Sequence, residues 1–279
     1  MKVELHSHTH YSHQTKVFFD GVNSPKDMVR AAKQKGLDAI VISDHDTLQG
    51  YQQAKKYAKK YNIQVICGEE ITSLDGHILA VGIDEVINTK LSAEETIDLI
   101  HEQGGIAIST HPFDIKGVGL REKARLCDAV EVFNAQNLDR ISNIRARNYV
   151  ARYKSAETAG SDAHSTDMIG HAFVSVDAAD LDGILNAIKK NKAKLYTQYM
   201  PLHIIRDVAV RRLQLSYDYV TNYIEENYWL PKRFVAKRML ALVNHYPGKI
   251  THLFRIFTYL SLGGVITYSF FKTLQDQLS

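Results

Sequence analysis

Short runs of apolar and β-branched residues alternate with helical segments through the first 200 residues, and this alternation constrains the fold more than any other feature of the chain. The runs that predict strands are 2–5, 37–43, 63–68, 77–83, 106–110, 128–134, 154–160, 172–176 and 193–197. The segments that predict helices are 24–36, 47–61, 92–105, 139–153 and 179–190. Alternation of this kind is typical of parallel strands joined by crossover helices. So many strands favour an α/β barrel over an open sheet.

Polar side chains with metal-ligand chemistry follow these predicted strands, at the point where each strand ends. They are His6, His8, Asp44, His45, Glu69, Glu70, His111, Asn134, Asp162 and His164. The carboxyl ends of the strands of a β/α barrel converge on one face, where active sites lie. His77 differs because it begins a strand, and we expect a short hairpin across 71–78 to turn it toward the same face. The sequence therefore predicts one polar site at the mouth of the barrel.

Histidines and carboxylates gathered at one mouth suit Mn²⁺, Zn²⁺ or Fe²⁺, and the lack of cysteine in the set argues against a structural zinc finger. Residues i and i+2 of a strand point to the same side, so His6 and His8 can reach one ion. Asp162 and His164 repeat this spacing. A lone histidine is more often an ordinary surface or core residue. Six strand ends that all carry such residues are much harder to obtain by chance, and they predict a metal centre.

The chain resembles the PHP family, which is named for polymerase and histidinol phosphatase domains. The resemblance rests on motifs at 4–9 (ELHSHT), 20–47, 68–72 (GEEIT), 77–84, 110–112 (THP) and 160–164 (GSDAH), which occur in the family's order. It implies a distorted (β/α)7 TIM-like barrel over residues 1–200, with two or three divalent ions (Mn, Zn or Fe) at its mouth. The ligands it implies are His6, His8, His45, Glu70, His77, His111, Asp162 and His164. Asp44 would orient these ligands from behind.

Two positions depart from the family's pattern. Glu4 takes the place of an aspartate that usually begins the first motif. His13 stands where the family tends to have another aspartate, and it is a candidate ligand that cannot bridge two ions as a carboxylate can. Asp20 is the displaced equivalent if the segment between them holds an insertion. The binding of a third ion is therefore open, and Glu70 is the expected bridge between ions, with Glu69 as the alternative if the register is off by one.

The resemblance also implies an activity. It implies a metal-dependent phosphoesterase, a hydrolase in which a metal-activated water cleaves a phosphomonoester, a nucleotide or a short oligonucleotide. The candidate catalytic residues are Asp162, His164 and His111, of which either histidine would protonate the leaving group. The candidate phosphate-binding residues are Lys116, Arg121 and Lys123, although surface charges like these are at least as often simply solvated. The alternative is a degenerate PHP module that binds metal and acts as a scaffold through its C-terminal tail.

The charge of the barrel region limits its substrates. Residues 1–200 carry 24 Lys and Arg against 26 Asp and Glu, a balance that disfavours a long nucleic acid held by electrostatics alone. A small phosphorylated substrate fits better. The N-terminus lacks the long apolar stretch of a signal peptide, and Cys67 and Cys127 fit the buried thiols of a reducing compartment. We therefore expect a cytoplasmic protein.

Residues 201–279 form a separate region by composition, with 10 Lys and Arg against 5 Asp and Glu and with 13 of the 26 aromatic residues of the chain. We predict one long amphipathic helix over 202–228, a basic helix over 230–247, and a third segment whose residues 256–271 carry no charge. The preferred interpretation is a helical extension packed on the barrel or on a second copy of the chain in a homo-oligomer. Peripheral membrane contact and nucleic-acid contact are the alternatives. We expect this extension to serve partner choice or placement and not the chemistry.

Overall fold

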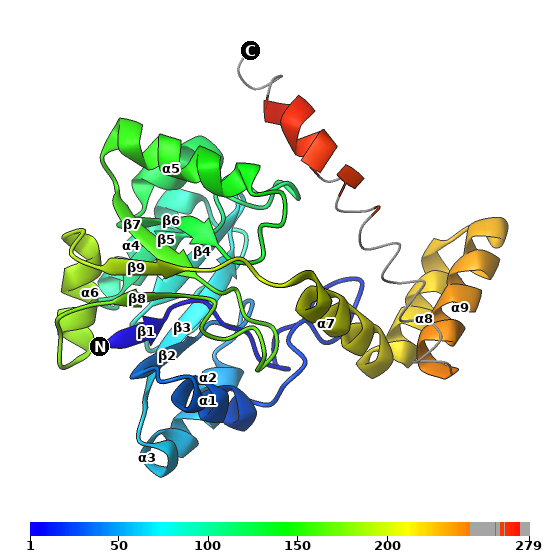
Figure 1. The fold of residues 1–279 in the computed structure, drawn as a ribbon, viewed down its shortest axis with the longest axis horizontal. Coiled ribbons are helices and arrows are strands. Elements are labelled where there is room, and N and C mark those ends of the chain that lie inside the picture. The colour runs from blue at the N-terminus through cyan, green and yellow to red at the C-terminus, as the bar shows by residue number, and fades with distance from the viewer. Residues whose placement is uncertain (246–259, 261–262, 265, 274–279) are drawn as a thin grey trace.

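The computed structural model describes residues 1–245, 260, 263, 264 and 266–273, and its centre is a sheet that curls into a nearly closed barrel (Figure 1). The strands are β1 (Lys2–Glu4), β2 (Ala39–Ile42), β3 (Gln64–Thr72), β4 (His77–Val81), β5 (Ile106–Ser109), β6 (Ala129–Asn134), β7 (Ala156–Gly160), β8 (Ala172–Ser175) and β9 (Lys194–Thr197). Their order in the sheet is β7-β6-β5-β4-β3-β2-β1-β8-β9. Ser7, just beyond β1, forms a parallel bridge with Ala163, just beyond β7, and this bridge closes the barrel at its mouth. The fold is the predicted α/β barrel.

The strands run in both directions. The expectation of parallel pairing is correct for β1–β2–β3 and for β5–β6–β7, whereas β4, β8 and β9 run antiparallel to their neighbours. The register of β3 and β4 sets Thr72 opposite His77. The connection between them is a short turn, too short for the crossover that a parallel pair requires. The predicted hairpin is therefore confirmed, and it brings the start of β4 to the mouth of the barrel.

Helices pack around this sheet: α1 (Pro25–Gln34), α2 (Gln49–Ala54), α3 (Ala58–Tyr61), α4 (Ala93–Glu102), α5 (Ile141–Tyr153) and α6 (Leu181–Lys189). The hydroxyl of Ser24 accepts the N–H of Asp27 (3.2 Å) and caps α1, as its sequence predicts. The buried side of α1 joins the apolar cluster that includes Ile40 of β2. Leu185 of α6 lies against Gly82, at the end of β4 remote from His77, so α6 covers the barrel away from its mouth.

Residues 47–61 do not form the single helix that the sequence predicts. They divide into α2, a 3-10 turn η1 (Lys55–Tyr57) and α3, which ends at Asn62 in the left-handed region (φ 49°). No residue of η1 or α3 is fully buried, and only the partly buried rings of Tyr57 and Tyr61 pack against the core there, so packing does not impose one continuous α-helix. A second 3-10 segment, η2 (Arg121–Leu126), leads into β6.

Three helices follow the barrel and extend to one side of it (Figure 1): α7 (Leu202–Leu215), α8 (Tyr217–Asn227) and α9 (Leu230–His245). The helix predicted over 202–228 is broken at Ser216, so it forms α7 and α8 instead of one rod. The basic helix predicted after it is confirmed as α9. Val220 and Ile224 of α8 and Leu240 of α9 form a small apolar cluster of their own.

The third segment predicted in the extension lies largely outside the described residues. Of its described part, Ser269 is buried and donates a hydrogen bond to Asp139 Oδ2 (2.6 Å), which joins the extension to the loop before α5. Within the described ranges, no helix combines the length and apolarity that crossing a membrane requires.

Candidate metal centre

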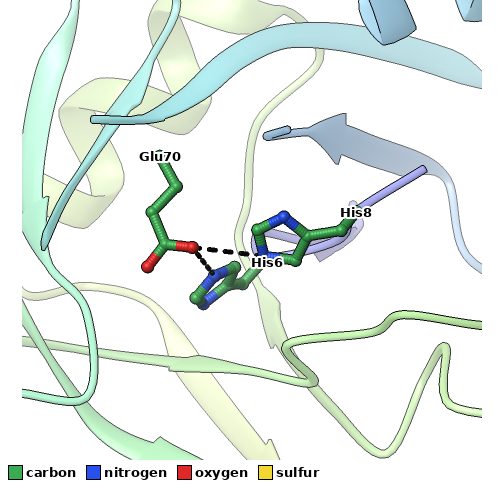
Figure 2. A group of neighbouring side chains, drawn as sticks. All are labelled: His6, His8 and Glu70. Atoms are coloured by element: carbon green, nitrogen blue, oxygen red, sulfur yellow. Dashed lines mark hydrogen bonds and ion pairs between the residues drawn. The ribbon is translucent and has the colours of Figure 1, made fainter. Parts of the chain in front are cut away.

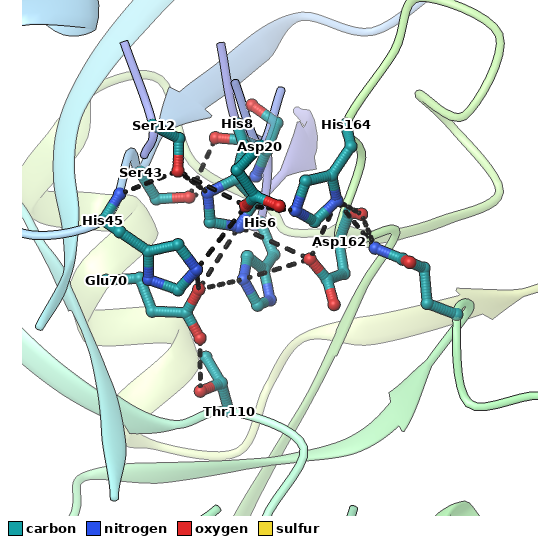
Figure 3. Close-up of polar contacts among 12 residues, drawn as sticks. His6, His8, Ser12, Asp20, Ser43, His45, Glu70, Thr110, Asp162 and His164 are labelled. Carbon is teal, nitrogen blue, oxygen red and sulfur yellow. Dashed lines mark hydrogen bonds and ion pairs between the residues drawn. The ribbon is translucent and has the colours of Figure 1, made fainter. Parts of the chain in front are cut away.

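The histidines and carboxylates that follow the strands meet at the mouth of the barrel (Figure 3). Beyond the strand ends lie His6 and His8 (β1), His45 (β2), His111 (β5), and Asp162 and His164 (β7), while Glu70 belongs to β3 and His77 begins β4. A ring nitrogen of each of these six histidines lies 3.0–3.4 Å from a carboxylate oxygen of Glu70 or Asp162. The structure therefore brings all eight ligands implied by the resemblance into one cluster.

Glu70 lies at the centre of the cluster, and its two oxygens face different histidines. Oε2 is 3.3 Å from Nε2 of His6 and 3.2 Å from Nε2 of His8 (Figure 2). Oε1 is 3.0 Å from Nε2 of His111 and 3.2 Å from Nδ1 of His77. A carboxylate whose two oxygens face separate sets of ligands has the arrangement that a bridge between two ions needs.

Asp162 faces a second side of the cluster. Its Oδ1 lies 3.4 Å from Nε2 of His8 and 3.4 Å from Nδ1 of His164, and its Oδ2 accepts a hydrogen bond from the side-chain amide of Asn134 (3.2 Å). Its backbone has φ 51°, a left-handed conformation that aspartate and asparagine adopt more readily than most residues. The turn after β7 therefore depends on the type of residue at this position.

Asp20 joins the cluster, and His13 does not. Asp20 is buried, and its Oδ2 lies 2.8 Å from Nε2 of His164 and 3.6 Å from Nε2 of His45. His13 is exposed, and its Nδ1 is 2.7 Å from the carbonyl oxygen of Phe18, because the segment before Asp20 loops out of the mouth. Of the two residues proposed for this position, the structure places Asp20 and not His13 in the cluster, as expected if the segment between them is an insertion.

The donor set fits divalent ions. Four groups of three have ligand atoms within 4.8 Å of one another: His6–His8–Glu70, His8–Asp162–His164, His8–Asp20–His45 and His45–Glu70–His77. Nε2 of His8 and Nδ1 of His77 are buried and make no hydrogen bond among the described residues, although carboxylate oxygens lie 3.2 Å from each. Ring nitrogens that lie near carboxylate oxygens without hydrogen bonding to them are placed as the donors of a shared metal ion would be. Imidazole and carboxylate donors without thiolate suit Mn²⁺, Zn²⁺ or Fe²⁺.

The carboxylates of the cluster are held as anions. Burial opposes the ionisation of Glu70, but neighbouring histidines, His45 and His6 foremost, hold its pKa well below the usual range. Burial lowers the pKa of His8, but Asp162 and Glu70 outweigh this effect and raise it to about 9. A metal ion that binds the ring nitrogen of His8 competes with a proton for the same lone pair, so metal binding should release protons.

Glu131 supports the cluster through His6 and the backbone of His111, and it was not among the residues predicted from the sequence. Its Oε1 lies 3.0 Å from Nδ1 of His6, and its Oε2 accepts the backbone N–H of His111 (2.8 Å) and the side-chain amide of Asn134 (3.0 Å). A carboxylate on the far nitrogen of a histidine fixes the tautomer that presents the other nitrogen to a metal. Glu131 lies inside β6, not at its end. The available signal was a single carboxylate in an otherwise apolar strand.

Asp44 lies behind the histidines, as expected of a residue that orients them, and it acts on the turn that follows His8. Its carboxylate accepts both the backbone N–H and the hydroxyl of Thr9, so it contacts the turn after His8 and no histidine ring. Its orienting effect therefore acts through the backbone of that turn. Gly50 leaves room for it, since a Cβ at that position would lie 1.7 Å from Asp44 Oδ2.

The candidate phosphate-binding residues lie on the segment beside His77. The N–H of His77 donates to the carbonyl of Val118 (2.8 Å), which places this segment against the mouth. Lys116 is exposed on it. Lys123 is bound elsewhere, with its ammonium 2.9 Å from Asp75 and 3.3 Å from Glu94. Lys116 and Arg121, which begins η2, remain the two candidates for phosphate binding.

Glu69 points away from the cluster. Successive residues of a strand face opposite sides, and Glu69 Oε2 accepts the backbone N–H of Ile87 (3.0 Å) on the side away from Glu70. The structure therefore places Glu70, and not the alternative Glu69, at the centre of the cluster. Burial raises the pKa of Glu69 to about 7.

This pKa gives a prediction for stability. The folded protein holds the Glu69 proton between pH 4.5 and 7 while the unfolded chain releases it, so the free energy of unfolding should fall by up to about 3 kcal/mol as the pH rises through that window, and should then level off. Glu69→Gln should remove this part of the pH dependence, with exposed Glu102→Gln as the control. Urea unfolding at pH 5 and pH 8 measures it. Equal pH dependence in Glu69→Gln and the wild type would contradict the assignment.

Comparison with known proteins agrees with this geometry. The family model of the PHP domain matches residues 4–201. An uncharacterized protein of Methanocaldococcus jannaschii, MJ1587, is 40% identical over 158 residues, which are 54% of this chain and 92% of that protein. A 5'-3' exoribonuclease of Haemophilus influenzae is 35% identical over 88 residues, 30% of each chain. A crystal structure from Bacteroides vulgatus, of a two-domain protein containing a predicted PHP-like metal-dependent phosphoesterase, has a TM-score of 0.56 at 19% identity and covers 76% of this chain and 69% of its own, which supports the barrel fold.

Proposed function

The chain belongs to the PHP domain family, and from this premise we propose that it is a metal-dependent phosphoesterase that hydrolyses phosphomonoesters, nucleotides or short oligonucleotides. The observation that carries the proposal is the convergence of six histidines with Glu70, Asp162 and Asp20 on one mouth of the barrel. A purely structural metal site needs about four ligands, whereas this cluster holds overlapping groups for more than one ion.

The charge of the barrel region and one relative both bear on the size of the substrate. The barrel region is slightly acidic, so electrostatics alone would not hold a long nucleic acid there. The similarity to a protein named 5'-3' exoribonuclease favours a nucleotide or the end of a short oligonucleotide over an unrelated phosphomonoester. Lys116 and Arg121, on the segment beside His77, are the side chains that we propose for binding its phosphate.

Each group at the mouth has a role in the proposed reaction. Two or three divalent ions, Mn, Zn or Fe, would supply charge neutralisation of the phosphate ester and activation of water when bound. Glu70 would hold two of them, and Asp162 and Asp20 would bind at either side. Nδ1 of His164 is already held by the carbonyl of Asp162 (2.7 Å), which leaves only Nε2 to act as a ligand. Nδ1 of His111 has no hydrogen-bond partner among the described residues, so His111 is the better candidate to pass a proton to the leaving oxygen.

Metal dependence gives the direct test of the proposal. Protein purified without chelator should bind two or three equivalents of Mn²⁺, Zn²⁺ or Fe²⁺ by elemental analysis. It should hydrolyse an aryl phosphate, nucleoside monophosphates or 5'-phosphorylated oligonucleotides. Chelation followed by dialysis should abolish this activity, and added metal should restore it. Less than one equivalent after loading would overturn the metal centre.

A loaded protein that is inert toward the whole panel would favour the alternative, a PHP scaffold that acts through its C-terminal extension. That the extension contacts a second copy of the chain or a membrane surface stays a prediction. We also propose a cytoplasmic site of action, because Cys67 and Cys127 are both buried free thiols, as expected in a reducing compartment.

A further inference from the structure

The loop that carries Asp20 into the cluster rests on the C-terminal extension. Between His13 and Lys16 this loop is exposed, and its apolar residues follow immediately. Val17 packs against the apolar cluster that Val220, Ile224 and Leu240 form in α8 and α9. Figure 1 shows the N-terminal loop (blue) running to α7, away from the barrel. The loop thus shares a core with the extension.

Polar contacts fix the same loop to α8 and to the break that precedes it. The hydroxyl of Ser216 accepts the backbone N–H of Phe19 (3.1 Å), and the hydroxyl of Tyr219 donates to the carbonyl of Thr15 (3.1 Å). The rings of Phe18 and Tyr219 lie 5.7 Å apart. These contacts hold the loop at Thr15 and again at Phe18 and Phe19, just before Asp20. The course of the loop therefore depends on the position of the extension.

Arg212 of α7 contacts Asp20, the residue at which the loop ends. Its Nε donates to the backbone carbonyl of Asp20, and its Nη2 lies 2.8 Å from Oδ1 of the same residue. The other oxygen, Oδ2, is thereby left facing His164 and His45. Asp20 is fully buried, so no water from bulk solvent can replace Arg212 beside this carboxylate. Nη2 and Oδ1 form an ion pair without hydrogen-bond geometry, so the hydrogen bond from Nε to the carbonyl holds the backbone of Asp20 while the guanidinium charge draws Oδ1 toward Arg212.

We propose that the C-terminal extension completes the metal centre, with Arg212 as a positioning residue that holds Asp20 Oδ2 toward the ion site shared with His45 and His164. This inference rests on the proposed function and deepens it, because it assigns control of one ion to residues outside the barrel. It also replaces the expectation that the extension has no part in the chemistry. Asp20 lies at the end of a long loop, and a ligand on such a loop needs support that the strand-borne ligands receive from the sheet.

The test compares variants of the full chain by the ions they bind. Arg212→Leu keeps an apolar stem but removes both contacts, Arg212→Lys keeps the charge, and Arg211→Leu changes the exposed neighbour on the same helix. Binding of Mn²⁺ is measured by elemental analysis after dialysis against set free concentrations, and binding of Co²⁺ by its visible absorption. We expect Arg212→Leu to weaken binding of one ion by about 10- to 100-fold and to leave the others unchanged. Arg212→Lys should recover part of this loss, and Arg211→Leu should match the wild type.

A second comparison shows whether Arg212 acts through Asp20. In an Asp20→Asn background, Arg212→Leu should cause no further loss of metal affinity, since the ligand it positions is already gone. Additive losses in the double variant would overturn the proposal. So would wild-type affinity for every ion in Arg212→Leu, which would reduce the contact to an anchor for the extension. If the wild type binds its ions but hydrolyses nothing, the proposed function is wrong. The role of Arg212 is still decided by the metal affinities of the variants.

Discussion

Glu70→Gln is expected to lower phosphoester hydrolysis by at least about 1000-fold and to remove at least one bound ion. An amide has one oxygen where the carboxylate has two, so it cannot face His6 and His8 with one oxygen and His77 and His111 with the other. The substitution also removes a full negative charge from a site that is meant to hold several cations. Size and shape are preserved, so the barrel should fold.

Glu69→Gln is the matched control for this result. It makes the same chemical change one residue earlier on β3, on the side of the strand where the carboxylate accepts the N–H of Ile87. Metal content and turnover should equal those of the wild type. Metal content by elemental analysis and initial rates at saturating Mn²⁺ measure both variants. If Glu69→Gln lost metal while Glu70→Gln kept it, the register of the bridging carboxylate would be the reverse of the one described.

The barrel and most of its mouth were predictable because strand periodicity and strand ends are local features of a sequence. His6 and His8 share a face by their spacing alone, and the carboxyl ends of neighbouring strands must meet once the sheet closes. The hairpin that returns His77 to the mouth followed from the short turn between two apolar runs. None of these inferences requires knowledge of a distant contact.

The remaining members of the site depend on contacts between distant parts of the chain. The sequence offered both His13 and Asp20 for this position but could not choose between them, because the loop that joins them contacts α7 and α8 nearly 200 residues later. Glu131 and His6 are likewise far apart in sequence. Local pattern also could not separate Asp44, which supports a backbone turn, from Glu131, which supports a histidine ring.

Glu4 shows how a departure from a family pattern is accommodated. Its longer side chain accepts the N–H of Ser161 (3.0 Å) and of Gly170 (2.9 Å), together with the hydroxyl of Ser161 (2.6 Å). These bonds tie β1 to the turn that carries Asp162. A buried carboxylate in this place thus supports the geometry of the mouth without entering it.

Asp162→Asn is expected to lower turnover by about 100- to 10,000-fold while the barrel stays folded. The backbone at this position is left-handed, and asparagine tolerates that conformation, whereas alanine would add strain. Asn134 donates to Oδ2, so the new amide should turn its carbonyl oxygen toward Asn134 and its amino group toward His8. An amino group there cannot bind a metal ion, so both the charge and the donor atom are lost.

Asp167→Asn gives the matched control, because it removes the same charge from an exposed position in the same turn region. Its turnover and metal content should be those of the wild type. Circular dichroism and thermal unfolding establish that Asp162→Asn is folded before its rate is compared. A folded Asp162→Asn that keeps full metal content and turnover within about tenfold of the wild type would remove Asp162 from the reaction. Glu70 and Asp20 would then be the carboxylates on which metal binding depends, and the positioning of Asp20 by Arg212 would matter more for turnover than the turn after β7.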